Sequence, residues 1–272
     1  MNISSARQYF YQEVRQPDKY INLARAALYI AQEEYPDLDP AEYLNVLDTM
    51  AMELEDRLPS SRYPLRIIQS INQYLYEELG FHGNKIDYYD PHNSFLNDVI
   101  EHKTGIPITL ALVYMEVAKR IDFSMVGVGM PGHFLIRPDI KDMGIFVDAF
   151  NGGEVMFSQD CEARLSQIYQ QQVTLKPEFL SIVTNRQFLA RMLTNLKYIY
   201  LEQQDLERSL GTVERILLLF PERILEVRDR GLLCYQLGQF SQAAEDLQVY
   251  LFKVPDARDG DVIRQLLDKL SF

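Results

Sequence analysis

The sequence predicts an α+β fold followed by an all-helical region, on three observations. Apolar residues recur at helical spacing up to about residue 80 and again from about residue 178. Between these regions, residues 125–137 and 143–149 have the composition of strands and are separated by a loop, which is typical of an antiparallel layer. Two prolines that lie 34 residues apart, Pro221 and Pro255, indicate a helical repeat near the end of the chain.

The length of the chain favours two domains. Its 272 residues exceed the size of one typical domain. We place the first domain at residues 1–177, with a helical part at 1–80 and a helix-and-strand core at 81–165. A helical repeat domain then covers residues 178–272.

Three amphipathic helices account for the helical part. Asp39 is a good N-cap and Pro40 suits the first helical position, so a helix is expected to begin there. Gly80 is a good residue to end the last of the three. Their sequences are INLARAALYIAQEEY, DPAEYLNVLDTMAMELEDRL and YPLRIIQSINQYLYEELG.

The core region predicts a buried helix beside the strands. A short helix is expected at residues 94–103, and a second at 108–121 after the break TGIP. The second helix, ITLALVYMEVAKRI, is apolar on nearly every side, and such helices are normally buried. The expected layer is therefore this helix against the antiparallel strands.

The last region contains a repeat. Its second unit, around YQLGQFSQAAEDL, has small, aromatic and turn residues at the positions where tetratricopeptide repeats have them: Gly231, Cys234, Gly238, Phe240, Ala243 and Pro255. In the preceding unit Tyr200, Leu206 and Ser209 take corresponding places, but Gln204 replaces the turn glycine. The alternative is an ordinary helical hairpin with chance spacing.

Charge and cysteine content exclude several classes of protein. The net charge is −12, and the basic residues are scattered, so nucleic acid and anionic membranes are not expected partners. Two cysteines without metal-ligand spacing, no signal-peptide core and no long apolar run favour a reduced, cytoplasmic protein. Phosphate-binding glycine motifs are absent, so no cofactor is expected.

Chemistry is expected from a histidine and an aspartate. His133, in GVGMPGHFLI, precedes Asp148, in GIFVDAF, by fifteen residues, and antiparallel strands could place the two side by side. A buried aspartate that accepts a hydrogen bond from histidine fixes the tautomer and orientation of the imidazole. The pair would be two thirds of a nucleophile–His–Asp triad.

This order of a buried helix, a strand with GH and a strand with D resembles the transglutaminase-like, papain-related cysteine hydrolases. More closely, GNKIDYYDPHNSFLNDVIEHKTGIPITLALVYMEVAKR, GVGMPGHFLI and VDAFNGG resemble the SirB-type family of bacterial proteins. These join a transglutaminase-like domain to C-terminal tetratricopeptide repeats, and a related region occurs in an F-box ubiquitin-ligase subunit family. The resemblance covers most of the chain and implies His133 and Asp148 as triad members.

The resemblance also implies that the nucleophile is missing. Active members begin the buried helix with Gly-x-Cys, whereas this chain has Gly105-Ile106-Pro107, which puts Pro107 in the nucleophile's place. Thr109, on the same first turn, is an alternative nucleophile, although its hydroxyl could simply bond the start of the helix. Cys161 is another alternative, although free cysteines are mostly inert core residues. Cys234 is expected to be structural.

Four polar residues are expected at the mouth of the cleft: Tyr88, Tyr89, Asn93 and Asn97. The alternative is that these residues only form turns and cap a helix, with Asn93 or Ser94 as an N-cap. His82, His92 and His102 recur at ten-residue steps, which is not metal-ligand spacing, so no metal is expected.

Two functions therefore remain open. The first is a non-catalytic adaptor that binds protein or peptide partners through its cleft and repeats. The second is a hydrolase or acyltransferase that uses His133 and Asp148 with Thr109, Cys161 or an activated water. The oligomeric state stays open.

Overall fold

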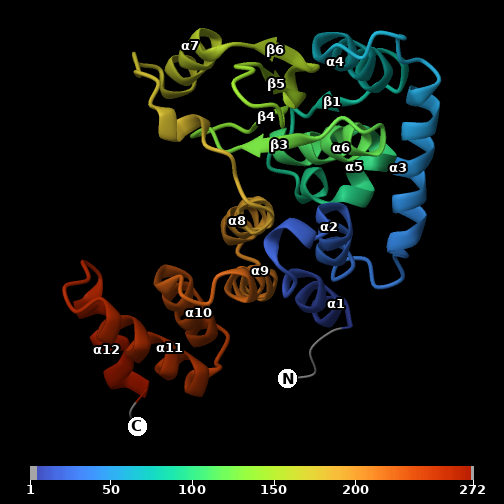
Figure 1. Ribbon diagram of the computed structural model, residues 1–272. Helices are drawn as coiled ribbons and strands as arrows, with labels where there is room; N and C mark the ends of the chain where they lie inside the picture. Colours follow the sequence, from blue (N-terminus) through green and yellow to red (C-terminus); the bar gives the residue numbers. More distant parts are fainter. Residues whose placement is uncertain (1–4, 271–272) are drawn as a thin grey trace. The chain divides into compact units, whose positions relative to one another are not determined.

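The computed structural model describes residues 5–270. The chain forms two compact units, Met1–Leu189 and Ala190–Phe272. The first contains helices and all the named strands, and the described residues of the second form helices joined by turns (Figure 1). The α+β prediction is confirmed, whereas the boundary expected at residues 177/178 stays a prediction. None of the described helices is both long and apolar enough to cross a membrane.

The first unit begins with helices whose starts the sequence specifies. The carboxylate of Asp39 accepts a hydrogen bond from the main-chain N–H of Ala41, and Pro40 takes the first helical position, as predicted. One stretch predicted as a single helix changes to a π-helix part-way along, at Gln73. The elements are α1 Ser5–Val14, η1 Asp18–Tyr20, α2 Leu23–Ala31, α3 Pro40–Glu55, α4 Pro64–Asn72 and the π-helical η2 Gln73–Glu78.

The predicted buried helix is the centre of this unit. Helix α6, Pro107–Arg120, lies beside the strands β3 and β4 (Figure 1). It also contacts the turn η4, and almost all of its residues are buried. The shorter helix α5 spans Leu96–His102 and follows Phe95, so the expected N-cap at Asn93 or Ser94 is wrong. Those two residues belong instead to a 3₁₀ turn, η3 Pro91–Ser94. Strands β1, His82–Gly83, and β2, Thr104–Gly105, form a short parallel pair.

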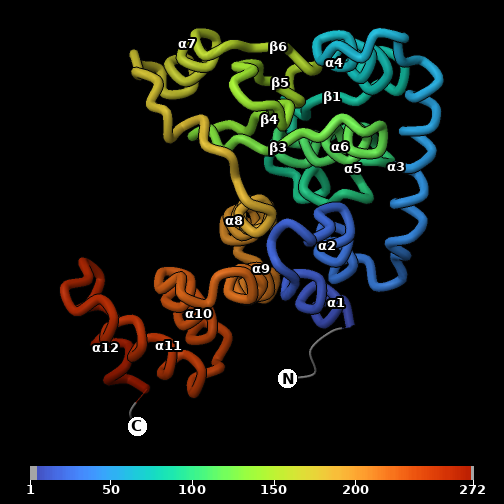
Figure 2. The backbone as a smooth tube through the Cα atoms, in the orientation of Figure 1, coloured from blue at the N-terminus to red at the C-terminus, as the bar shows by residue number. Residues whose placement is uncertain are grey.

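The main sheet is a four-stranded antiparallel meander (Figure 2). Its strands are β3 Met125–Val128, β4 Leu135–Pro138, β5 Phe146–Asp148 and β6 Glu154–Met156. The prediction of a single strand at residues 125–137 is therefore wrong. The chain reverses at Pro131-Gly132, where Gly132 has φ +71°, and β3 pairs with β4 as a hairpin. His133 consequently lies in this turn region, just before β4, and not within a strand.

Helix α7, Ser158–Tyr169, follows β6 and was not expected from the sequence. It packs on the sheet through an apolar cluster that includes Val128, Met130, Leu135, Phe146, Met156, Cys161 and Leu165. A 3₁₀ turn, η5 Pro177–Leu180, leads to helix α8, Asn185–Glu202. Because α7 packs on β5 and β6, its side chains can reach the ends of these strands.

The second unit consists of helical hairpins. After α8 it contains α9 Leu206–Leu219, α10 Ile224–Gln236, α11 Phe240–Lys253 and α12 Gly260–Leu270. Gly238 turns between α10 and α11 with φ +75°, and Gln204 adopts the same left-handed conformation, φ +58°, between α8 and α9. A side chain at Gly231 would meet Leu247 at 2.9 Å, so this glycine allows α10 and α11 to approach closely.

Candidate functional site

His133 and Asp148 are in direct contact. The Nε2 atom of His133 lies 2.8 Å from Oδ2 of Asp148. Both are buried, with 8% of His133 and 0% of Asp148 exposed. The register of β4 and β5 pairs Ile136 with Val147, so the turn before β4 carries His133 past the end of β5 to reach the aspartate. Since Nε2 is bonded to Asp148, any proton transfer by this histidine would involve Nδ1.

Asp148 accepts more hydrogen bonds than this one. Its Oδ1 accepts the main-chain N–H groups of Phe150 and Asn151 at 3.1 and 3.3 Å, because Asp148 is the N-cap of the 3₁₀ turn η4, Ala149–Asn151. Its Oδ2 also accepts the side-chain amide of Asn151 at 2.9 Å and Nη1 of Arg164 at 2.7 Å. Burial by itself would raise the pKa of Asp148, but His133, Asn151 and Arg164 outweigh burial and hold that pKa below its ordinary value.

Arg164 is the site residue that sequence reasoning missed. It extends from α7 and joins Asp148 to Glu154, whose carboxylate lies 2.7 Å from Nη2. A helical reading of residues 158–169 would have placed Arg164 one turn beyond Cys161, on the face toward the sheet. Because the arginine also bonds Asp148, that aspartate serves two side chains and not His133 alone.

The turn after Asp148 is fixed by the π-helix. Tyr76, in η2, donates from its hydroxyl to the carbonyl of Ala149 at 2.9 Å. Asn72, the last residue of α4, donates from Nδ2 to the carbonyl of Gly153 at 2.7 Å, and its Oδ1 accepts from the hydroxyl of Tyr114 at 2.9 Å. These contacts explain the second glycine of the NGG sequence, because a Cβ atom at Gly153 would lie 2.1 Å from Oδ1 of Asn72.

Gly153→Ala is expected to destabilise the first unit by about 2 kcal/mol, because the residue has φ +73° and its new Cβ would displace Asn72. Gly152→Ala is the matched control. Gly152 has φ +68° but no atom within 4 Å of the position of its Cβ, so only about 1 kcal/mol of backbone strain is expected. Urea denaturation of both variants would measure the difference, and equal losses would contradict the role of Asn72.

The first turn of α6 contains Pro107 and Thr109, both buried. The Thr109 oxygen accepts the main-chain N–H of Ile106 at 3.1 Å and donates to the carbonyl of Asn93 at 2.7 Å. The hydroxyl is thus held by the start of α6 and by η3. This is the helix-start role that the sequence allowed for Thr109.

Thr109→Val is expected to lower the free energy of unfolding by about 1–3 kcal/mol, because the buried N–H of Ile106 and carbonyl of Asn93 both lose a partner. Thr109→Ser keeps the hydroxyl and should retain most of the stability. Chemical denaturation would compare the two. A valine variant as stable as the serine variant would remove the structural account of this hydroxyl.

Cys161 lies in the apolar cluster between α7 and the sheet and is fully buried. Burial raises the pKa of its thiol to about 11, with a further contribution from the nearby Asp160. The thiolate, which is the nucleophilic form, is therefore disfavoured at neutral pH. Cys234 is likewise buried in the second unit, between α10 and its neighbours.

The four residues expected at the cleft mouth divide into two pairs. Tyr88 contacts Phe150 edge to face at 6.0 Å, and Phe150 in turn contacts the ring of His133 at 6.3 Å. Tyr89 packs on Tyr88 and is 63% exposed. Asn93 and Asn97 are buried instead: Asn93 donates to the carbonyl of Asp87 at 2.7 Å, and Asn97 donates to the side chain of Asp98 at 3.2 Å.

The remaining histidines have separate hydrogen-bond partners. Nδ1 of His82 contacts the carbonyl of Gly80, Nδ1 of His92 contacts Asp90, and Nδ1 of His102 contacts the carbonyl of Asp98. Within residues 5–270, no group of three or more His, Cys, Asp or Glu side chains could hold a metal ion.

Comparison with known proteins places this sequence in a family. Residues 41–194, more than half of the chain, match the model of the transglutaminase-like superfamily. The chain belongs to the transglutaminase-like superfamily. Residues 196–268 match a tetratricopeptide-repeat model, in agreement with the hairpins of the second unit. The His133–Asp148 pair and the first turn of α6 both lie within the transglutaminase-like match.

Relatives extend this similarity over most of the chain. A UPF0162 protein of Xylella fastidiosa is 37% identical over 93% of this chain and 92% of its own length. A UPF0162 protein of Vibrio cholerae is 26% identical over 83% of each chain. F-box only protein 21 of Homo sapiens is 26% identical over 83% of this chain and 40% of its own length. No solved structure matches the chain at a significant level.

Proposed function

We propose that this protein is a non-catalytic adaptor of the SirB type, with Pro107 at the position where active relatives carry the nucleophile. Its transglutaminase-like domain would hold a protein segment and its repeats a second one. The observation that carries the proposal is the first turn of α6, where Pro107 offers no reactive atom and the hydroxyl of Thr109 bonds Ile106 and Asn93.

Two further observations support an adaptor. Cys161, the other thiol considered for this site, is fully buried with a raised pKa. The bonds from Asp148 to His133 and Arg164 join the turn before β4, the end of β5 and helix α7. In this proposal the retained pair fastens the fold around the binding site and performs no chemistry.

The repeats support a protein partner. Arrays of such helical hairpins form concave surfaces on which other chains bind. Both cysteines are free and buried, which is compatible with the reducing, cytoplasmic location that we propose. We propose protein or peptide partners, without nucleic acid or membrane lipid, for both domains.

Site-specific photo-crosslinking tests the adaptor. A benzophenone amino acid would replace Tyr89, in the first unit, or Tyr198, in α8, since both are well exposed. Met52 in α3, which belongs neither to the residues expected at the cleft mouth nor to the repeats, is a comparably exposed control position. We expect defined protein segments to crosslink at Tyr89 and Tyr198 and not at Met52. The proposal fails if neither position captures a segment while the purified protein turns over amide or ester substrates.

One observation favours a second function, a hydrolase or acyltransferase. The 2.8 Å bond between His133 and the buried Asp148 is the arrangement that orients a general base. With Thr109 and Cys161 engaged in the fold, an activated water is the attacking group that this alternative favours. It requires turnover that falls at least about 100-fold in His133→Gln. A protein inert toward a broad panel of amides and esters would exclude this alternative.

A further inference from the structure

A polar pocket lies beside helix α5, and the proposed function makes no use of it. Its volume is about 380 Å³, within the range of small-ligand sites. Every lining residue is polar: two asparagines and a threonine, together with Asp90, His92, Asp98 and His102. These come from η3, α5, β2 and the loop after β1. No arginine or lysine lines it.

Asp98 is the most unusual group of this pocket. It is 6% exposed, yet its carboxylate is bonded only to neutral donors. The hydroxyl of Tyr35 donates to Oδ2 at 2.8 Å, and Nδ2 of Asn97 donates to Oδ1 at 3.2 Å. Burial raises the pKa of Asp98, against the opposing contributions of Tyr35 and the nearby His92 and His102. A buried carboxylate whose hydrogen-bond partners are all neutral is costly for a fold to retain.

Asn97, next to Asp98 but not itself a lining residue of the pocket, is incompletely paired. Among the described residues, Oδ1 of Asn97 is buried without a hydrogen-bond partner. The amide cannot be reversed at no cost, because its oxygen would then face the carboxylate of Asp98. His102 contacts the carbonyl of Asp98 through Nδ1, so in its neutral form Nε2 is an acceptor as well. The lining contains two carboxylates and a histidine, His92, whose pKa is raised by its bond to Asp90, so it keeps an excess of negative charge that a ligand with N–H donors and positive charge would complement.

We propose that this pocket binds a guanidinium group. This group occurs both in free guanidine compounds and in the arginine side chains of proteins. Guanidinium carries five N–H donors and a positive charge, which match the two carboxylates of the lining, Asp90 and Asp98. It is weakly hydrated and keeps its charge when desolvated, whereas a buried ammonium readily loses its proton. The inference rests on the pocket alone and stands whether or not His133 and Asp148 are catalytic.

Calorimetric titration of the full chain at neutral pH tests the proposal with two probes. Agmatine represents a free guanidine, and N-acetyl-arginine-methylamide represents an arginine within a chain. N-acetyl-lysine-methylamide and tetramethylammonium are the comparison cations. We expect saturable binding of at least one guanidine, at least tenfold tighter than either comparison cation. Binding of agmatine alone indicates a free metabolite, and binding of the arginine amide indicates a protein ligand.

Variants locate the binding. Asp98→Asn should weaken the guanidine at least tenfold, whereas Asp56→Asn, which removes the same charge from a separate pocket beside α3, should not. If Asp98→Asn fails to fold, Asp90→Asn, at a more exposed lining position, replaces it and should likewise weaken binding of the guanidine. The proposal is wrong if neither guanidine saturates, if the lysine probe or tetramethylammonium binds as tightly, or if the folded pocket variant binds like the wild type.

Discussion

Asp148→Ala is expected to lower the free energy of unfolding of the first unit by about 3–5 kcal/mol. The carboxylate is fully buried and accepts hydrogen bonds from His133, Arg164, Asn151 and the main chain of η4. Its removal leaves the guanidinium of Arg164 beside a cavity without its buried counter-charge. Urea denaturation, together with hydrogen exchange of peptides from β5 and α7, would measure the loss in this unit.

The control for this variant is Glu154→Gln. Glu154 is the exposed partner of the same arginine, so its neutralisation should cost less than about 1 kcal/mol. The contribution of Asp148 should also depend on pH with a definite sign. Its pKa lies below the ordinary value in the fold, so its stabilisation is complete above about pH 4, the unfolded pKa, and is lost as pH falls through the folded pKa. A loss in Asp148→Ala no larger than that in Glu154→Gln would overturn this account.

Local sequence signals were sufficient to predict most of the helices. Asp39 and Pro40 start α3, and the uniformly apolar run beginning at Ile108 is buried as α6. In the second unit, the turn at Gly238 follows from glycine's access to positive φ. Gln204 adopts the same conformation without that advantage, and the turn there is closed by the main-chain bond from Asp205 to Tyr200 and by Asp205 as the N-cap of α9. These features depend on periodicity and capping, which neighbouring residues determine.

The rest of the candidate site depends on contacts between distant segments. The apolar residues around Pro131-Gly132 resemble a strand, but the turn signal of this pair outweighs their β propensity and separates β3 from β4. The bond from Arg164 to Asp148 joins α7 to the end of β5, and no local pattern encodes it. Likewise, the reason for the glycine at position 153 is Asn72, which lies 81 residues earlier in the chain.

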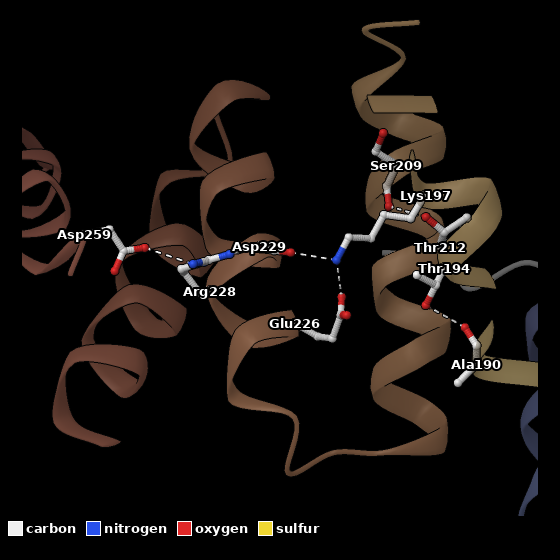
Figure 3. Close-up of polar contacts among 9 residues, drawn as sticks. All are labelled: Ala190, Thr194, Lys197, Ser209, Thr212, Glu226, Arg228, Asp229 and Asp259. Carbon is white, nitrogen blue, oxygen red and sulfur yellow. Dashed lines mark hydrogen bonds and ion pairs between the residues drawn. The ribbon is translucent and has the colours of Figure 1, made fainter. Parts of the chain in front are cut away.

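Lys197→Met is expected to lower the free energy of unfolding of the second unit by about 3 kcal/mol. Lys197 is 5% exposed, and its Nζ atom lies 2.7 Å from both Glu226 and Asp229, so it joins α8 to α10 (Figure 3). Methionine keeps the apolar stem but leaves two largely buried carboxylates facing each other without this cation. Arg228 still contacts Asp229 at 2.7 Å, and this limits the loss to the lower end of the range for a broken buried pair.

A compensating variant separates the contribution of charge from that of side-chain packing to the stability at Lys197. Adding Glu226→Gln and Asp229→Asn to Lys197→Met removes the uncompensated charges while nearly preserving side-chain volume, so the triple variant should recover most of the lost stability. Lys253→Ala, at an exposed position of α11, should change stability by no more than about 0.5 kcal/mol. Hydrogen exchange in α8 and α10 would follow all three variants. If Lys197→Met is as stable as Lys253→Ala, the ion pairs of Lys197 do not hold these helices together, and apolar packing alone fixes the repeat.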